Sequence, residues 1–97
     1  MTTIYWRDIP AQVTASGDGV TGKAMLEPRF QHAIDRAAAV ADLTETDAYV
    51  AQWRRVQSPL DGDPTEAAEA LAAKLSQDYP RDRLERLVAQ GGAESTP

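Results

Sequence analysis

The first eight residues after Ile4 hold the densest group of side chains that could recognise another molecule. They combine two aromatic rings with a cation, an anion and an amide: Tyr5, Trp6, Arg7, Asp8 and Gln12. Arginine and aromatic side chains dominate the binding energy of many protein interfaces. The alternative is structural, with Trp6 in the core, Arg7 and Asp8 paired locally, and Asp8 capping a turn. The first interpretation predicts a donor–acceptor surface for a partner or a ligand.

A second candidate is a basic stripe formed by Arg29, His32 and Arg36, which follow one another at i, i+3 and i+7. On a helix these positions share one face, where two guanidinium groups could bind a carboxylate or a phosphate. Glu27 and Asp35 lie close enough to neutralise part of the charge, so a solvated helix face is the alternative. Catalysis by His32 would need an orienting carboxylate and a nucleophile, and no motif in the sequence supplies them.

Two further motifs have simpler explanations. Trp53, Arg54 and Arg55 are predicted to end a helix, where arginines complement the helix dipole and the helical period turns Trp53 inward. The glycines in the sequence GDGVTG, residues 17–22, match the spacing of a dinucleotide-binding loop. That fingerprint requires a helix directly after the loop, and a strand is predicted there instead.

Composition narrows the classes of function. The 97 residues suit one domain, contain no cysteine, and include a single histidine, which cannot form a zinc site alone. No segment is apolar enough for a signal peptide or a membrane span, so the expected location is the cytoplasm. The net charge is −5, concentrated after residue 56, which disfavours binding to nucleic acid.

The secondary structure predicted to position these residues changes from strands to helices near residue 27. Before it, strands are predicted at 3–7 and 12–15 and, more weakly, at 23–26, separated by Pro10 and by the turn at 16–19. After it, helices are predicted at 28–42, from Thr44 to about 56, from Asp63 to about 78, and at 81–90. The predicted fold is α+β, a small antiparallel sheet of two or three strands followed by four helices. Its domain spans residues 1–90, before a disordered tail at 91–97.

The predicted core is thin, because the chain has only six aromatic residues. Too few large apolar side chains are present to cover both faces of a sheet, so one face is expected to be bare. Alternation along the first strand predicts that this face carries Tyr5 and Arg7, opposite Ile4 and Trp6. Six residues are expected to be largely buried: Trp6, Phe30, Ile34, Trp53, Leu71 and Leu84. A thin core also favours association with a partner or with a second copy of the chain.

Four segments resemble a small bacterial family known only as "virulence factor": YWRDIPAQV at 5–13, RFQHAIDRAA at 29–38, DAYVAQWR at 47–54 and YPR at 79–81. The resemblance covers most of residues 3–88, and a similar domain closes a larger conserved virulence factor protein. Stand-alone members are encoded beside methylenetetrahydrofolate reductase-like and corrinoid methyltransferase proteins. The resemblance therefore implies an accessory role in one-carbon metabolism, and it implies no catalytic residues.

Two functional hypotheses follow. The first is a non-catalytic accessory or interaction subunit with a protein partner and no cofactor, associated with a folate or corrinoid methyltransfer enzyme. The alternative is a domain that binds a small anion, or a minor enzyme, using Arg7, Asp8, Gln12 and His32. A water-excluding pocket is hard to build in so short a chain, which favours the first hypothesis.

Overall fold

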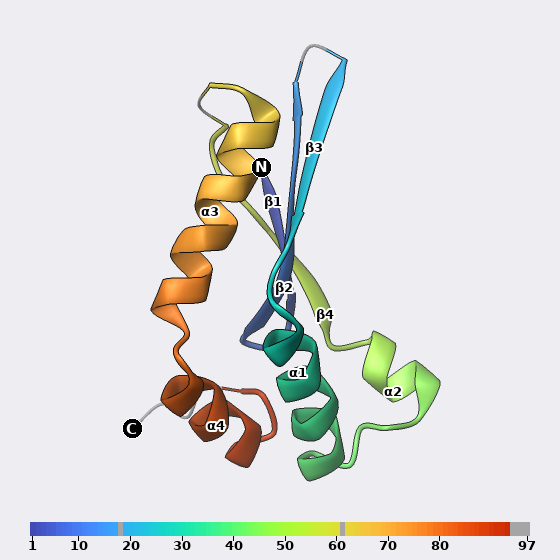
Figure 1. The fold of residues 1–97 in the computed structure, drawn as a ribbon. Coiled ribbons are helices and arrows are strands. Elements are labelled where there is room, and N and C mark those ends of the chain that lie inside the picture. Colours follow the sequence, from blue (N-terminus) through green and yellow to red (C-terminus); the bar gives the residue numbers. More distant parts are fainter. Residues whose placement is uncertain (18, 61, 94–97) are drawn as a thin grey trace.

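The computed structural model describes residues 1–17, 19–60 and 62–93. These residues form four strands and four helices in an α+β arrangement, drawn in Figure 1. The strands are β1 (Thr2–Trp6), β2 (Ile9–Gly17), β3 (Val20–Met25) and β4 (Trp53–Gln57). The helices are α1 (Pro28–Val40), α2 (Thr46–Val50), α3 (Pro64–Asp78) and α4 (Arg81–Ala89).

The strands form one antiparallel sheet in the order β3-β2-β1-β4. The predicted α+β class and antiparallel pairing are confirmed, with one strand more than expected. Strand β2 is longer than predicted because it begins at Ile9, includes Pro10, and continues through Ser16 and Gly17 of the predicted turn. Proline is tolerated in this inner strand because the register shifts beside it, where Ile4 pairs with Gln12 and Tyr5 pairs with Pro10.

The extra strand corrects the helix predicted from Thr44 to about 56. Helix α2 ends at Val50, and the chain then runs antiparallel to β1, with Trp53 opposite Trp6 and Gln57 opposite Thr2. The spacing of Tyr49, Trp53 and Val56 fits a helical period, but a local period cannot detect a free strand edge more than 40 residues away. Pairing along that edge satisfies the backbone groups of β1, and this favours the strand.

The two faces of the sheet differ sharply. Val13, Ala15 and Gly22 lie on the face covered by α3, and all three are buried. Figure 1 shows α3 running alongside the sheet, with α1 and α4 gathered at its lower end. Residues paired across neighbouring strands point to the same side of the sheet. The register therefore places on the other face the side chains that alternate with Val13, Ala15 and Gly22 and those paired with them. We call this set the open face: Thr2, Ile4, Gln12, Thr14, Ser16, Thr21, Lys23, Met25, Trp53, Arg55 and Gln57.

None of the open-face side chains is fully buried. The expectation of one bare face is therefore confirmed, but its composition is corrected. The bare face carries Ile4, whereas Tyr5 lies on the α3 side of the sheet and Arg7 follows the end of β1. Trp6 shares the side of Ile4 but is covered at the lower end of the sheet, where its ring stacks on Tyr49 at a centroid distance of 5.5 Å.

Helix boundaries follow local signals. Helix α3 begins as predicted, with Pro64 in its first turn and the Asp63 carboxylate accepting a 3.0 Å hydrogen bond from the Glu66 N–H. Helix α1 ends at Val40, two residues earlier than predicted, because Asp42 adopts a left-handed conformation with φ +58°. Helix α4 ends one residue earlier than predicted.

The core lies between the covered face of the sheet, α1, α3 and α4. Four of the six residues predicted to be largely buried are so: Trp6, Phe30, Ile34 and Leu84. The prediction is wrong for Trp53 and Leu71, which are half-buried. Trp53 belongs to the edge strand β4, and the inward side of α3 is formed by Ala68, Ala72 and Leu75 instead.

The C-terminal end continues past the predicted domain limit at residue 90. Gly91 and Gly92 are buried, and the carbonyl of Gly92 accepts a 2.9 Å hydrogen bond from the N–H of Asp8. Both glycines have positive φ angles, and a Cβ on Gly92 would lie 2.8 Å from Cζ3 of Trp6. Residues 94–97, within the predicted tail, lie outside the described residues. Among the described residues, no helix has the length and apolarity needed to cross a membrane.

Candidate binding surfaces

Arg7 occupies the turn between β1 and β2 rather than a strand face. Its backbone has a φ angle of +53°, and its N–H donates a 3.1 Å hydrogen bond to the carbonyl of Gln52. The guanidinium donates to Gln52 Oε1 through Nε and to the Gly91 carbonyl through Nη1, each at 3.1 Å. It also lies 5.7 Å from the centre of the Trp6 ring. Arg7 therefore joins the turn to the start of β4 and to the C-terminal end of α4.

Asp8 is held by Arg54 of the edge strand. Nη2 of Arg54 donates a 3.1 Å hydrogen bond to Asp8 Oδ1, and its Nε donates a 2.7 Å bond to the carbonyl of Arg7. The same guanidinium lies 4.6 Å from the centre of the Tyr5 ring. Tyr5, Arg7 and Asp8 thus gather at one end of the sheet, around an arginine that was predicted to end a helix.

The recognition surface predicted from residues 5–12 is not formed as one continuous surface. Gln12 pairs with Ile4 on the open face, whereas Tyr5 lies on the opposite side. His32 lines a separate cavity between α1 and α4. The combination of Arg7, Asp8, Gln12 and His32 considered for a minor enzyme is consequently distributed over three regions of the molecule.

The open face instead carries residues outside the sites predicted from the sequence. Its only charged side chains are Lys23 and Arg55, and within the described structure neither makes a hydrogen bond or an ion pair. Met25 is 64% exposed. It borders a shallow groove of about 240 Å³, together with Ile4, Ala11, Gln12, Gln31 and Trp53. The alternation of Lys23 and Met25 along a predicted strand could have indicated this face. Arg55 could not be placed on it, because its segment was predicted to be helical.

The basic stripe is formed as predicted. Arg29, His32 and Arg36 all line a cavity of about 280 Å³ between α1 and α4, over a floor of Ala33 and Leu84. The remaining lining residues are Arg81 and Glu85 of α4. We call this site the basic cavity. Arg81 could not be assigned to it from the sequence, because the packing of α4 on α1 is a tertiary contact.

Arg29 is fixed in the wall of the basic cavity by several hydrogen bonds. Its Nη1 donates to the Tyr79 carbonyl at 2.6 Å, and its Nη2 donates to the Ser76 carbonyl at 2.8 Å. Its Nε donates to Glu27 at 2.9 Å, and its guanidinium lies over the ring of Phe30. Hydrogen bonds from Ser76 and Arg29 lower the pKa of the exposed Glu27 carboxyl. This network joins the start of α1 to the end of α3.

Arg36 forms a bidentate ion pair with Glu85 across the two helices, with distances of 2.7 and 2.9 Å. The forked geometry of the Arg36 guanidinium gives Glu85 two hydrogen bonds. These bonds, and the nearby charges of Arg36 and Arg81, lower the pKa of the Glu85 carboxyl. The pKa of Arg36 is raised by the same pair.

This lowered pKa predicts a pH-dependent effect of Glu85→Gln. A carboxyl with a lower pKa in the folded state adds stability above its unfolded pKa of about 4.3, and the contribution disappears as the pH falls through the folded value. Both partners are exposed, so the effect is small. We expect Glu85→Gln to melt slightly below the parent at pH 7 and at the same temperature near pH 2. Glu69→Gln is the control, because Glu69 is exposed and its side chain makes no ion pair in the described structure. Its melting temperature relative to the parent should not change between the two pH values.

Comparison with curated proteins and with solved structures finds no match. The family model described as "Virulence factor" matches residues 4–88, from β1 to the last turn of α4. The resemblance seen in the four sequence segments is thereby confirmed over most of the folded domain. The chain belongs to the virulence factor family.

Proposed function

We propose that this domain is a non-catalytic accessory subunit that binds an acidic segment of a partner protein on its open face. The observation that supports this most directly is the charge of that face. The whole chain has a net charge of −5, yet the open face carries Lys23 and Arg55 and no acidic residue. A cationic surface on an acidic protein is complementary to carboxylates, and such complementarity sets the partner choice and the association rate.

The apolar part of the face supports a protein partner. Met25, Ile4 and Trp53 border the 240 Å³ groove and offer adaptable apolar surface on the same face as the two cations. An acidic segment with one apolar side chain could place that side chain in the groove and its carboxylates beside Lys23 and Arg55. A nucleic acid is disfavoured, because the acidic remainder of the molecule would repel its phosphates.

We further propose that the partner is a one-carbon enzyme, of the methylenetetrahydrofolate reductase-like or corrinoid methyltransferase class. This rests on the family resemblance alone. An accessory role fits a domain whose open face is shallow, since a flat surface suits docking better than chemistry on a small substrate.

The experiment compares two identical charge reversals at different places. Lys23→Glu changes the open face, whereas Lys74→Glu makes the same change on the exposed side of α3. Tagged parent and variants are used to capture partners from the native cell, and the affinity for the purified partner is then measured. We expect Lys23→Glu to weaken binding at least tenfold and Lys74→Glu to leave it within about twofold, which corresponds to more than about 1.4 kcal/mol against less than 0.5.

Arg55→Glu should weaken binding to the same degree as Lys23→Glu, because it reverses the other cation of the face. Melting temperatures within a few degrees of the parent would show that the variants remain folded. Equal loss of binding in Lys23→Glu and Lys74→Glu would contradict a specific role for the open face. Capture of nucleic acid in place of a protein would contradict the proposed class of partner.

A further inference from the structure

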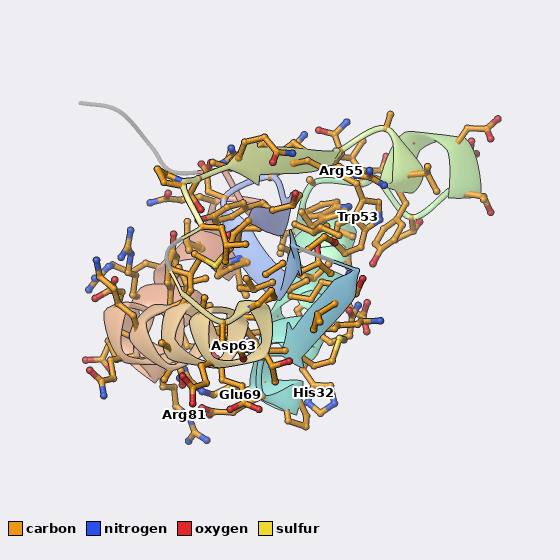
Figure 2. All side chains as sticks on the ribbon, turned by 90° about the horizontal axis from the view of Figure 1, so that it is seen from above. His32, Trp53, Arg55, Asp63, Glu69 and Arg81 are labelled. Atoms are coloured by element: carbon orange, nitrogen blue, oxygen red, sulfur yellow. The ribbon has the colours of Figure 1, made fainter. Side chains whose placement is uncertain are left out.

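We propose that the basic cavity is a second, separate binding site, and that its ligand is a small phosphorylated molecule carrying two negative charges. The cavity lies on the side of the molecule opposite the open face. Figure 2 shows this separation, with Trp53 and Arg55 on one side and His32 and Arg81 on the other. Ligand binding in the basic cavity and docking of a protein on the open face are independent of each other.

The charge around the cavity favours an anionic ligand. Three arginines line the cavity against one lining carboxylate, that of Glu85, and Glu27 pairs with Arg29 from outside the lining, so the arginines exceed these carboxylates by one charge. A phosphate monoester carries close to two negative charges at neutral pH and is attracted by this positive excess. Its three terminal oxygens also accept several hydrogen bonds from guanidinium groups, which favours a phosphate over a single carboxylate.

The hydrogen-bonding state of the four basic groups supports binding. Arg29 and Arg36 are held in place by Tyr79, Ser76 and Glu85, so their charges are positioned in advance. His32 and Arg81 are exposed and make no hydrogen bond or ion pair with the described residues. Two fixed cations and two uncommitted donors therefore surround one cavity, and the uncommitted pair can turn toward a ligand without breaking an existing contact.

The volume and position of the cavity also suit a small phosphorylated ligand. Its volume of about 280 Å³ exceeds that of a phosphate group and leaves room for a small organic portion over Ala33 and Leu84. Arg81 is the first residue of α4, whose N-cap Pro80 provides no side-chain hydrogen bond to the helix. The positive end of the α4 dipole, which Asp82 in the first turn partly offsets, adds to the field of the arginines.

The test measures binding of glycerol 3-phosphate, inorganic phosphate and succinate to the intact protein by titration of its backbone amide NMR signals. We expect saturable shifts in residues 29–36 and 81–85 with both phosphates. Succinate, a dicarboxylate of the same charge, should bind more weakly. Shifts elsewhere on the surface, or shifts that rise linearly without saturation, would overturn the proposal. Tighter binding of succinate would overturn the phosphate class.

Two charge reversals on the same helix locate the site. Arg81→Glu should weaken binding of glycerol 3-phosphate at least tenfold, whereas Arg86→Glu, outside the cavity lining, should change it less than about threefold. An acidic residue in the first turn of a helix is favourable, so Arg81→Glu should remain folded. His32→Gln should weaken binding only a few-fold, since it keeps a donor. Equal effects of the two arginine variants would overturn the proposed site. Arg81→Glu leaves the open face unchanged, so measuring its affinity for a protein partner tests the open face independently.

Discussion

Phe30→Ala is expected to lower the free energy of unfolding by about 3–5 kcal/mol, the usual cost of truncating a buried phenylalanine. Phe30 is 1% exposed, and its ring meets Tyr79 edge-on at a centroid distance of 6.2 Å. It also supports Arg29, whose guanidinium lies 4.5 Å from the ring centre. Folded domains have a total stability of about 5–15 kcal/mol, so the variant would lose a large share of it.

Urea denaturation followed by tryptophan fluorescence measures this loss. Phe30→Leu is the graded control, because it keeps most of the apolar volume and should cost less than the alanine variant. Val40→Ala on the same helix is the surface control, since Val40 is exposed and should change stability by less than about 0.5 kcal/mol. A loss below 1 kcal/mol for Phe30→Ala would show that this ring does not anchor α1 to the core.

The sequence predicts the helices of this fold better than its sheet. Asp63 and Pro64 define the start of α3 through local hydrogen bonding and a fixed φ angle, and both effects are visible within four residues. Strand β4 depends instead on the free edge of β1, more than 40 residues earlier, and its local spacing is equally compatible with a helix. Secondary structure that is stabilised by distant pairing is therefore the part that local patterns miss.

The same distinction applies to the candidate surfaces. Arg29, His32 and Arg36 could be grouped in advance because the helical period alone brings them together. Arg81 joins them only because α4 packs on α1, a contact with no local signature. In the sheet, the composition of the open face depends on the register shift beside Pro10 and on the pairing of β4, which comes late in the sequence, with β1. Predictions from the first strand alone therefore placed Tyr5 and Arg7 on the wrong surface.

Gly22 shows how closely the covered face of the sheet approaches α3. A Cβ at this position would lie 2.6 Å from the Cα of Thr65, 2.7 Å from its nitrogen and 2.8 Å from the carbonyl carbon of Pro64. All three atoms belong to the backbone, in the first turn of the helix, so no side-chain rotation can relieve the contact. Even one methyl group at residue 22 must push the start of α3 away from β3.

Gly22→Ala is accordingly expected to lower the free energy of unfolding by about 1–3 kcal/mol, the typical cost of overpacking a close contact. Gly17→Ala is the matched control in the neighbouring strand of the same hairpin. Its Cβ would meet Cδ2 of the Leu60 side chain at 3.2 Å and Cγ of Pro64 at 3.6 Å. Because the Leu60 side chain can move, and because alanine restricts the unfolded chain more than glycine does, this variant should be neutral or slightly more stable. Paired urea melts measure the difference directly, and equal stability of the two variants would mean that α3 can shift along the sheet without loss of packing.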